Sequence, residues 1–344
     1  MRPSYFLLSG EHTSLAYSEL RSVLKLFGHG DKVRLIDGRV AVADLPPSLH
    51  TAVCDRTAYT RASGILLSLH PYRGDEKPEI TISVDALDEI VDRPTTFRAE
   101  AIKLNGAIAN TMKLEATYAE VIMNTTTKLA VSLDNPSLVF QCIVTPKHLL
   151  AGVRLYQKPP RLFMWRRAGL RPFTTPTAIQ PKLARCMVNL AVTSQDSTVY
   201  DPFAGSGSIV VEAALLGHMA VGTELKTWIA NGMLKNLHLY VPGHEMVAQA
   251  DARKPPFRMS IDSIVTDPPY GRSSTITGKS LSKLLTDLLS QVGTLLRRGG
   301  RICITLPSEP AETFEAEKWA LKTLETHRIY VHKALTRYLS VFST

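Results

Sequence analysis

The sequence predicts an α/β protein in which a doubly wound parallel sheet follows an α+β N-terminal half. Three observations predict this class. Between residues 181 and 306, apolar runs of strand length alternate with runs of helical spacing, as in the βα units of a parallel sheet. A glycine-containing segment lies between the first of these strands and the following helix. Residues 1–157 instead mix short strands and helices without regular alternation, which is typical of small α+β layers.

The length and composition indicate an ordinary soluble globular protein with more than one domain. The 344 residues exceed one domain of about 100–200 residues. We divide the chain into an N-terminal half at 1–157, a basic, proline-rich linker at 158–172 and a C-terminal domain at 173–344. No apolar run approaches the ~20 residues needed to cross a bilayer. We therefore expect no membrane partner, and the scattered cysteines described next favour a reducing, cytoplasmic setting.

Four cysteines are spread along the chain, at Cys54, Cys142, Cys186 and Cys303. No two of them form a CxxC pair, so we expect neither a disulfide framework nor a metal site. Cys142 and Cys303 lie in apolar runs with the character of strands, which predicts buried thiols.

Charge is concentrated in the predicted linker and just beyond it. The formal net charge is +9, and an isoelectric point of about 9.4 is one footprint of nucleic-acid binding. Between residues 158 and 185 there is no Asp or Glu, whereas the basic residues are Lys158, Arg161, Arg166, Arg167, Arg171, Lys182 and Arg185. Two interpretations remain open: a solvated linker, or a basic strip that faces RNA or DNA.

The N-terminal half shows its elements through alternation and turn signals. We expect strands at 5–8, 33–36, 40–42, 80–84, 96–104 and 138–144, and a helix at 14–27. Asp37-Gly38 between two apolar runs is a hairpin signal. Gly28-His29-Gly30 is expected to end the helix.

The C-terminal elements follow in regular order. We expect helices at 182–191, 209–216, 227–239 and 281–296, and strands at 198–200, 218–223, 247–249, 263–266 and 301–306. Arg298-Gly299-Gly300 is expected to end the last helix.

A glycine loop, Asp201-Pro202-Phe203-Ala204-Gly205-Ser206-Gly207, joins the first of these strands to its helix. A strand, a glycine turn and a helix N-terminus form a crevice of the nucleotide-binding type. Val210 stands where a GxGxxG fingerprint requires glycine, which counts against a dinucleotide, and no Gly-Lys-Ser/Thr follows as in a Walker loop.

Acidic residues after the next two strands favour a nucleoside ligand. Glu224 ends the second strand and is placed to accept hydrogen bonds from ribose hydroxyls. Asp251 follows the third strand, where it could accept from an adenine amine. S-adenosylmethionine is a nucleoside without a pyrophosphate that suits this set. The candidate donor-site residues are Asp201, Ala204, Gly205, Ser206, Gly207, Glu224, Asp251 and Ala252.

A rigid acidic turn, Thr266-Asp267-Pro268-Pro269-Tyr270-Gly271, ends the fourth strand. Proline has a fixed φ and no amide hydrogen, so the strand stops there. Carboxyl ends of parallel strands share one crevice, which places the turn beside the proposed donor. Asp267 and a carbonyl of the turn could orient an exocyclic amine of a base, and Tyr270 could stack on a base taken out of its helix.

The candidate catalytic residues are Asp267, Pro268, Pro269 and Tyr270, and Arg272 could hold a phosphate. The turn contains no cysteine, which argues against a pyrimidine C5 methyltransferase because that chemistry needs a thiolate nucleophile.

The glycine loop and the turn, extended to Arg272 and Ser273, resemble the THUMP-domain tRNA guanine-N2 methyltransferases. Residues 171–190, with Arg171-Pro172-Phe173 at their start, look like the segment that precedes the donor loop in that family. Leu8-Ser9-Gly10-Glu11-His12 resembles the members that modify guanosine 10 of tRNA. Thr96-Phe97-Arg98-Ala99 and Asp134-Asn135-Pro136 are similar to THUMP strand motifs.

The resemblance implies a Rossmann-like methyltransferase domain preceded by a ferredoxin-like segment and a THUMP domain at about 45–155. It implies S-adenosylmethionine as donor, N2 of a tRNA guanine as acceptor, Asp267 as the catalytic acid-base residue, and tRNA as partner. As RNA contacts we expect Arg166, Arg167, Arg171 and Arg272. Whether a small activator protein is also needed, as in some eukaryotic relatives, stays open.

Three alternatives remain open at this point. The enzyme could modify another guanosine, such as guanosine 6. It could be a DNA amino-methyltransferase, although no base-reading domain is visible. The chain could also be a non-catalytic RNA-binding subunit, against which the intact Asp267 turn and the donor acids speak. One or two methyl transfers are both compatible with the sequence.

Overall fold

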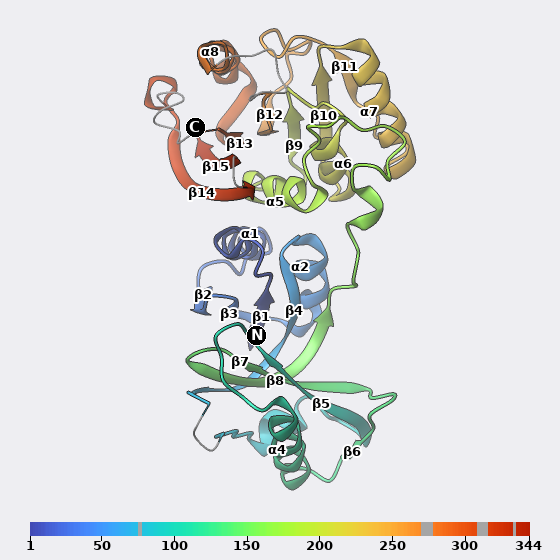
Figure 1. Cartoon of the computed structure of the whole chain (residues 1–344), viewed down its shortest axis with the longest axis vertical. Coiled ribbons are helices and arrows are strands. Elements are labelled where there is room, and N and C mark those ends of the chain that lie inside the picture. Colours follow the sequence, from blue (N-terminus) through green and yellow to red (C-terminus); the bar gives the residue numbers. More distant parts are fainter. Residues whose placement is uncertain (75–77, 270–277, 308–315, 333–334) are drawn as a thin grey trace. The chain divides into compact units, whose positions relative to one another are not determined.

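The computed structural model describes residues 1–74, 78–269, 278–307, 316–332 and 335–344 (Figure 1). The chain forms two compact units. The first comprises Met1–Asp55 and Thr60–Lys158, and the second comprises Arg56–Tyr59 and Pro159–Thr344.

The first unit is built on a sheet with the strand order β2-β3-β1-β4-β8-β7-β5-β6. Its strands are β1 (Arg2–Leu8), β2 (Arg34–Asp37), β3 (Val40–Leu45), β4 (Thr60–Pro71), β5 (Thr95–Lys103), β6 (Leu129–Val131), β7 (Leu138–Val144) and β8 (His148–Gln157). Its helices are α1 (Thr13–Leu26), α2 (His50–Arg56), α3 (Val84–Asp88) and α4 (Thr111–Thr125), with a 3₁₀ turn η1 at Pro47–Leu49.

Local signals located several of these elements. The expected hairpin is present as antiparallel β2 and β3, and Gly38 in its turn has a φ of 47°, in the left-handed region that favours glycine. A strand expected at 80–84 is wrong, because Val84 begins helix α3. Ser83 caps that helix by accepting a hydrogen bond from the Ala86 amide at 3.1 Å, and a capping serine outweighs a short alternation.

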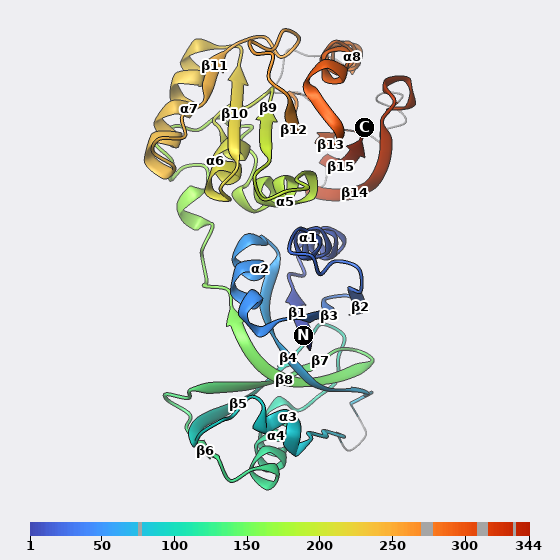
Figure 2. The same ribbon diagram turned by 180° about the vertical axis from the view of Figure 1, so that it is seen from behind.

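Long-range packing supplied elements that the sequence did not reveal. β4 and β8 were not expected, yet they pair along most of their length in the middle of the sheet. Helix α4 packs against β5 and β7 (Figure 2). Its buried residues Leu114, Tyr118 and Ile122 share one face. The rings of Phe97 and Phe140 meet edge to face in this core.

The second unit is built on a sheet with the order β11-β10-β9-β12-β13-β15-β14. Its strands are β9 (Thr198–Asp201), β10 (Met219–Glu224), β11 (Val247–Gln249), β12 (Ile261–Thr266), β13 (Leu296–Leu306), β14 (Lys322–His332) and β15 (Leu335–Ser343). Its helices are α5 (Pro181–Ala191), α6 (Ser208–Leu215), α7 (Thr227–Tyr240) and α8 (Gly278–Leu295), with 3₁₀ turns η2 (Met164–Arg166) and η3 (Ala316–Trp319).

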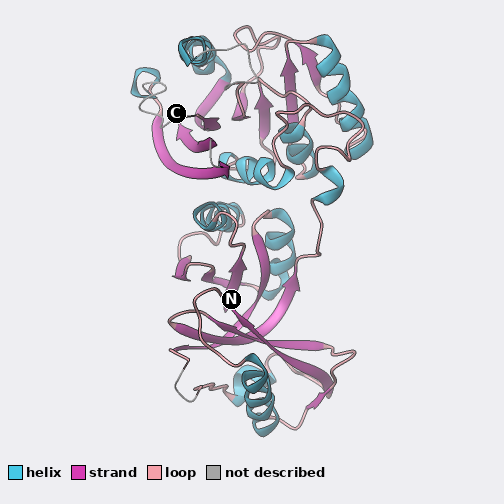
Figure 3. Cartoon of the chain, in the orientation of Figure 1, coloured by secondary structure: helices cyan, strands magenta, loops and turns pink. Residues whose placement is uncertain are grey.

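The predicted Rossmann-like βα alternation is confirmed in this unit. Strands β9 to β13 are parallel, and α5, α6 and α7 pack in series against them (Figure 3). One boundary was wrong: the helix ends at Leu295, and residues 298–300 lie inside β13 instead of ending the helix. The register between β12 and β13 shifts there, so the glycines occupy a bulge.

Two features of the sheet position the site. The first strand of this sheet in sequence is β9. The next two, β10 and β11, lie on one side of it, and β12 lies on its other side. This reversal is the topological switch point at which open α/β sheets bind ligands, outside the carboxyl ends of the strands. The unexpected strand β15 runs antiparallel to both β13 and β14, so its first residues lie at that same edge.

Candidate active site

At the switch point, a hydrogen bond joins the ends of the two central strands. Asp201 ends β9 and Thr266 ends β12. The Thr266 hydroxyl donates to Oδ1 of Asp201 at 2.7 Å, and the Phe203 amide donates to the same oxygen at 3.1 Å. The acid of the glycine loop and the start of the proline turn are therefore fixed to each other, although 65 residues separate them.

The environment of Asp201 makes its carboxyl unusual. Asp201 is only 2% exposed, and this burial raises the pKa of its carboxyl to about 7. The hydrogen bonds from Thr266 and Phe203 oppose this rise, while the nearby carboxylates of Asp267 and Glu224 add to it. A buried carboxyl that titrates near neutrality is suited to a cationic ligand, because a positive charge would favour its ionised form.

Two glycines of the loop have backbone conformations that disfavour a side chain. Gly205 and Gly207 have φ values of 52° and 83°, which only glycine adopts readily. A Cβ on Gly207 would lie 2.7 Å from Cγ of Met233. The Ala204 amide donates to the Thr223 carbonyl at 3.0 Å, which fixes the loop to β10.

Ser206 gives an observation that points to a ligand. Its hydroxyl is buried and has no hydrogen-bond partner within the part of the chain that the structure describes. An unsatisfied buried hydroxyl costs free energy, so a polar ligand at the glycine loop would relieve it. The residues present therefore fit a ligand with charged and hydrogen-bonding groups, such as the amino acid end of S-adenosylmethionine.

The two further acids lie at the strand ends where the sequence placed them. Glu224 ends β10, and its Oε1 accepts from the Lys226 amide at 3.0 Å. The carboxylate of Asp251, beyond β11, is held by Nε of Arg253 at 3.0 Å, and this contact lowers its pKa. Ala252 is buried beside it. Asp251 is thus kept ionised, as an acceptor should be.

The proline turn carries a carboxylate that is held on both sides. Asp267 has a side chain that is 14% exposed, and Pro268 is buried. The Thr305 hydroxyl donates to its Oδ1, and Nη1 of Arg337 donates to its Oδ2 at 3.1 Å. Sequence reasoning missed Thr305 and Arg337. The expected catalytic residue Tyr270 and phosphate contact Arg272 lie outside the described residues.

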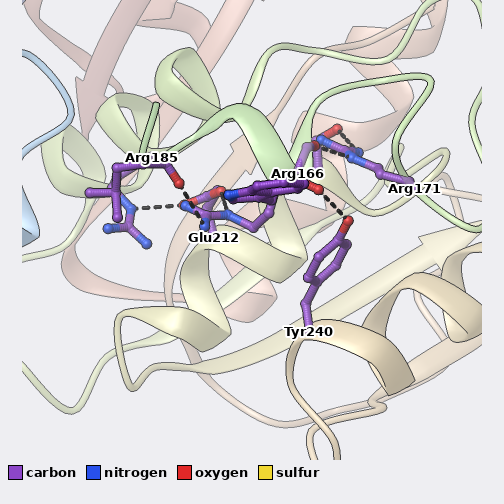
Figure 4. A network of polar contacts seen from close by, with 8 residues as sticks. Arg166, Arg171, Arg185, Glu212 and Tyr240 are labelled. Atoms are coloured by element: carbon purple, nitrogen blue, oxygen red, sulfur yellow. Dashed lines mark hydrogen bonds and ion pairs between the residues drawn. The ribbon is translucent and has the colours of Figure 1, made fainter. Parts of the chain in front are cut away.

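Two of the four expected RNA contacts have internal partners (Figure 4). Arg166 grips the buried carboxylate of Glu212 with Nε at 2.6 Å and Nη2 at 3.3 Å, and Arg185 binds the same carboxylate at 2.8 Å. Arg171 donates to the Ser208 hydroxyl at 2.7 Å and to the Arg166 carbonyl. These contacts fasten the basic segment to helix α6, which follows the glycine loop.

The same basic segment is also held by Asn236 of helix α7, and two of its side chains are exposed to solvent. The fully buried Asn236 accepts from the Phe173 amide at 3.0 Å and donates to the carbonyls of Phe173 and Ser206, both at 2.8 Å. Arg167 and Trp165 are exposed, the latter by 69%. The segment therefore supports the glycine loop with some side chains and faces solvent with others.

Other classes of site find no support in the described ranges. Within them, no group of three or more His, Cys, Asp or Glu side chains is arranged to hold a metal ion. All four cysteines are buried free thiols, which confirms the expectation for Cys142 and Cys303. Among the helices described, none has the length and apolar character needed to cross a membrane.

Comparison with known proteins agrees with this geometry. Residues 168–337 match the family described as UPF0020, RMKL-like, methyltransferase domain. A tRNA (guanine(10)-N2)-dimethyltransferase of Methanothermobacter thermautotrophicus is 30% identical over 336 residues, with 97% of each chain covered. The protein of the same name from Methanocaldococcus jannaschii is 25% identical, with 98% of each covered. The crystal structure of TrmN from Thermus thermophilus covers all of both chains with a TM-score of 0.54 at 19% identity, which shows a shared fold.

Proposed function

We propose that this chain, which belongs to the family of the tRNA (guanine(10)-N2)-dimethyltransferases, methylates N2 of guanosine 10 in tRNA. The observation that carries the proposal is the hydrogen bond between Thr266 and Asp201, at 2.7 Å. It holds the acid of the glycine loop and the strand end that bears Asp267 in one crevice. Direct transfer requires that donor and acceptor meet in such a crevice.

The donor site comprises the eight residues that the sequence singled out. S-adenosylmethionine, when bound, supplies an electrophilic methyl group on a positively charged sulfur. In our proposal Asp201 and the Ser206 hydroxyl hold its amino acid end, with backbone amides at Ala204, Gly205 and Gly207. Glu224 accepts from the ribose hydroxyls, and Asp251 beside Ala252 accepts from the adenine amine.

The acceptor side works through the proline turn. The amine lone pair of guanine is delocalised into the ring, so the amine is a weak nucleophile. Asp267 and a carbonyl of the Pro268-Pro269 turn accept its hydrogens, which orients it and favours a pyramidal nitrogen. Bound S-adenosylmethionine would supply its methyl group to this nitrogen, with the sulfur keeping the C–S electron pair, and Asp267 would take the proton that the nitrogen loses. Tyr270 stacks on the base.

RNA binding is proposed for the N-terminal half. We place a ferredoxin-like segment and a THUMP domain, at about 45–155, within residues 1–157, followed by the linker at 158–172 and the methyltransferase domain at 173–344. Arg167 and Arg272 are the proposed phosphate contacts of the catalytic half. Arg166 and Arg171 contribute by holding the segment in place. With tRNA as its substrate, the enzyme belongs in the cytoplasm.

A labelled-donor experiment tests the function. A tRNA transcript is incubated with the chain alone and with S-adenosylmethionine that carries a labelled methyl group, and its nucleosides are analysed by mass spectrometry. We expect label in N2-methylated guanosine at position 10, and none in a transcript with inosine there, because inosine lacks the N2 amine. The result also reports one or two methyl groups and whether a small activator protein is required.

Three outcomes would contradict parts of the proposal. Label at guanosine 6 would move the position, label in DNA would change the substrate, and no transfer would favour a non-catalytic subunit. Asp267→Ala should abolish transfer while the dissociation constant of the donor stays within about twofold, because Asp267 faces the acceptor. Full activity in that variant would remove Asp267 from the mechanism.

A further inference from the structure

Two residues far along the chain converge on the carboxylate of the proline turn. Thr305 lies near the end of β13, and Arg337 lies near the start of β15. They are 38 and 70 residues from Asp267 in sequence. Because β15 runs antiparallel to β13, with Leu306 opposite Tyr338, its first residues reach the carboxyl ends of the parallel strands. The unusual direction of one strand thus delivers a guanidinium to the switch point.

The contacts divide between the two carboxylate oxygens. Thr305, which is fully buried, donates its hydroxyl to Oδ1, and Arg337 donates Nη1 to Oδ2 at 3.1 Å. The terminal torsion of an aspartate is otherwise broad, so donors on different oxygens restrict the rotation of the carboxylate plane. An ionised carboxylate offers about four acceptor positions, more than the donors Thr305 and Arg337 occupy.

Arg337 suits this task for a second reason. The side chains of Arg337 and Asp267 are 20% and 14% exposed, so both charges are largely removed from water. An ion pair in such surroundings is screened by solvent much less than an exposed pair, so Arg337 holds the carboxylate oxygen in place. Arginine does not lose its proton in proteins, so it cannot compete with Asp267 as the proton acceptor.

We propose that Arg337 and Thr305 are positioning residues for methyl transfer, which orient the Asp267 carboxylate toward the acceptor amine. The inference rests on the proposed function, because it assigns Asp267 to the acceptor side of the crevice. Arg337 and Thr305 act through Asp267 and touch neither the donor nor the base. Their loss therefore affects the rate of the chemical step and leaves both binding steps intact.

The test compares single-turnover rates at saturating donor and tRNA. Displacing a catalytic group by about 1 Å costs on the order of 100-fold, so we expect a 10- to 100-fold slower rate for Arg337→Met and about tenfold for Thr305→Val. Dissociation constants for donor and tRNA should stay within about twofold of wild type. Thr305→Ser retains the hydroxyl and should retain the rate. Arg337→Lys keeps the charge without the guanidinium geometry and should fall between wild type and Arg337→Met.

A matched control lies at the opposite end of the same strands. Nη1 of Arg297, in β13, contacts Oδ1 of Asp262, in β12, at 2.9 Å. Arg297→Met removes an ion pair between β13 and β12, away from the crevice, and should leave the rate unchanged. If the melting temperature shows that Arg337→Met does not fold, the single-turnover rate of the nearly isosteric Thr305→Val tests the inference instead.

Clear results would overturn the inference. Rates within twofold of wild type for both Arg337→Met and Thr305→Val would do so, as would a loss confined to tRNA affinity, which would make Arg337 a phosphate contact. If wild type transfers no methyl group, the proposed function fails by itself. Crystal structures of wild type and the two variants then decide: a carboxylate of Asp267 that keeps its orientation in both variants rejects the positioning role, and a rotated one supports it.

Discussion

Ionisation of Asp201 should make donor binding depend on pH. The residue is 2% exposed, and burial raises its pKa from 3.8 to about 7. If the carboxylate holds the ammonium group of the donor, as we propose, binding below pH 7 must first remove a proton. The dissociation constant of the donor should therefore rise about tenfold for each pH unit below 7 and level off above it. In Asp201→Asn, binding should be weaker at pH 8 and nearly independent of pH.

The raised pKa of Asp201 also affects stability. Because it is raised, the free energy of unfolding falls with increasing pH, whereas it rises for an aspartate with a lowered pKa. A rise from 3.8 to about 7 corresponds to roughly 4 kcal/mol of preference for the protonated form. Without donor, the folded chain keeps this proton between about pH 4 and 7, whereas the unfolded chain releases it. This group therefore lowers the free energy of unfolding as pH rises through that window, by ~1.4 kcal/mol per unit.

Calorimetric titration measures both effects directly. Donor binding to wild type at pH 6, repeated in buffers of different ionisation enthalpy, should release close to one proton, and Asp201→Asn should release none. Denaturant unfolding of the donor-free proteins at pH 5 and 7 should show wild type losing stability relative to Asp201→Asn. A dissociation constant that stays constant from pH 5.5 to 8, with no proton release, would refute the assignment of Asp201 to the donor.

Three further predictions concern the support of the donor loop. Gly207→Ala should weaken donor binding at least tenfold, whereas Gly217→Ala, with a similar φ of 85° and open space around the added methyl, should lower the melting temperature only through backbone strain. Arg166→Ala should lower the free energy of unfolding by about 3 kcal/mol, because it breaks a buried ion pair. Arg167→Ala should leave stability unchanged and should reduce the slope of log tRNA affinity against log salt by about one unit. Equal effects of the two variants would refute the assignment of Arg166 to support and Arg167 to RNA. Asn236→Ala should lower the free energy of unfolding by about 2–4 kcal/mol, because the Phe173 amide and the carbonyls of Phe173 and Ser206 lose their hydrogen-bond partner. The variant should also bind the donor more weakly. Denaturant titration and calorimetry measure the two effects.

Local signals predicted which residues lie at the carboxyl end of the sheet. The glycine loop, the acids after β10 and β11, and the proline turn all lie at strand ends, and the order of parallel strands brings such ends together. Gly207 was recognisable because a glycine before a helix indicates a backbone that a side chain would obstruct. The observed φ and the contact with Met233 give the physical reason.

The remaining parts depended on contacts between distant residues. No local pattern near Arg337 predicts that β15 lies between β13 and β14 and runs antiparallel to both. Charge alone also does not reveal the partner of an arginine: Arg166 and Arg167 are neighbours, but only Arg166 meets Glu212, 46 residues away. The strand expected at 80–84 is absent for a local reason, because Ser83 caps helix α3 and the chain turns into that helix at Val84.

The hydrogen bond from Thr266 to Asp201 has a consequence for how ligands bind. It connects a side chain that faces the proposed donor with the strand that leads into the turn for the acceptor. A donor that held Asp201 in its ionised form would strengthen this hydrogen bond and restrain the strand end further. By thermodynamic reciprocity, tRNA must then alter the affinity for the methyl donor by the same factor as the donor alters the affinity for tRNA. Occupancy of one half of the crevice would thus be sensed in the other without any large movement of the chain.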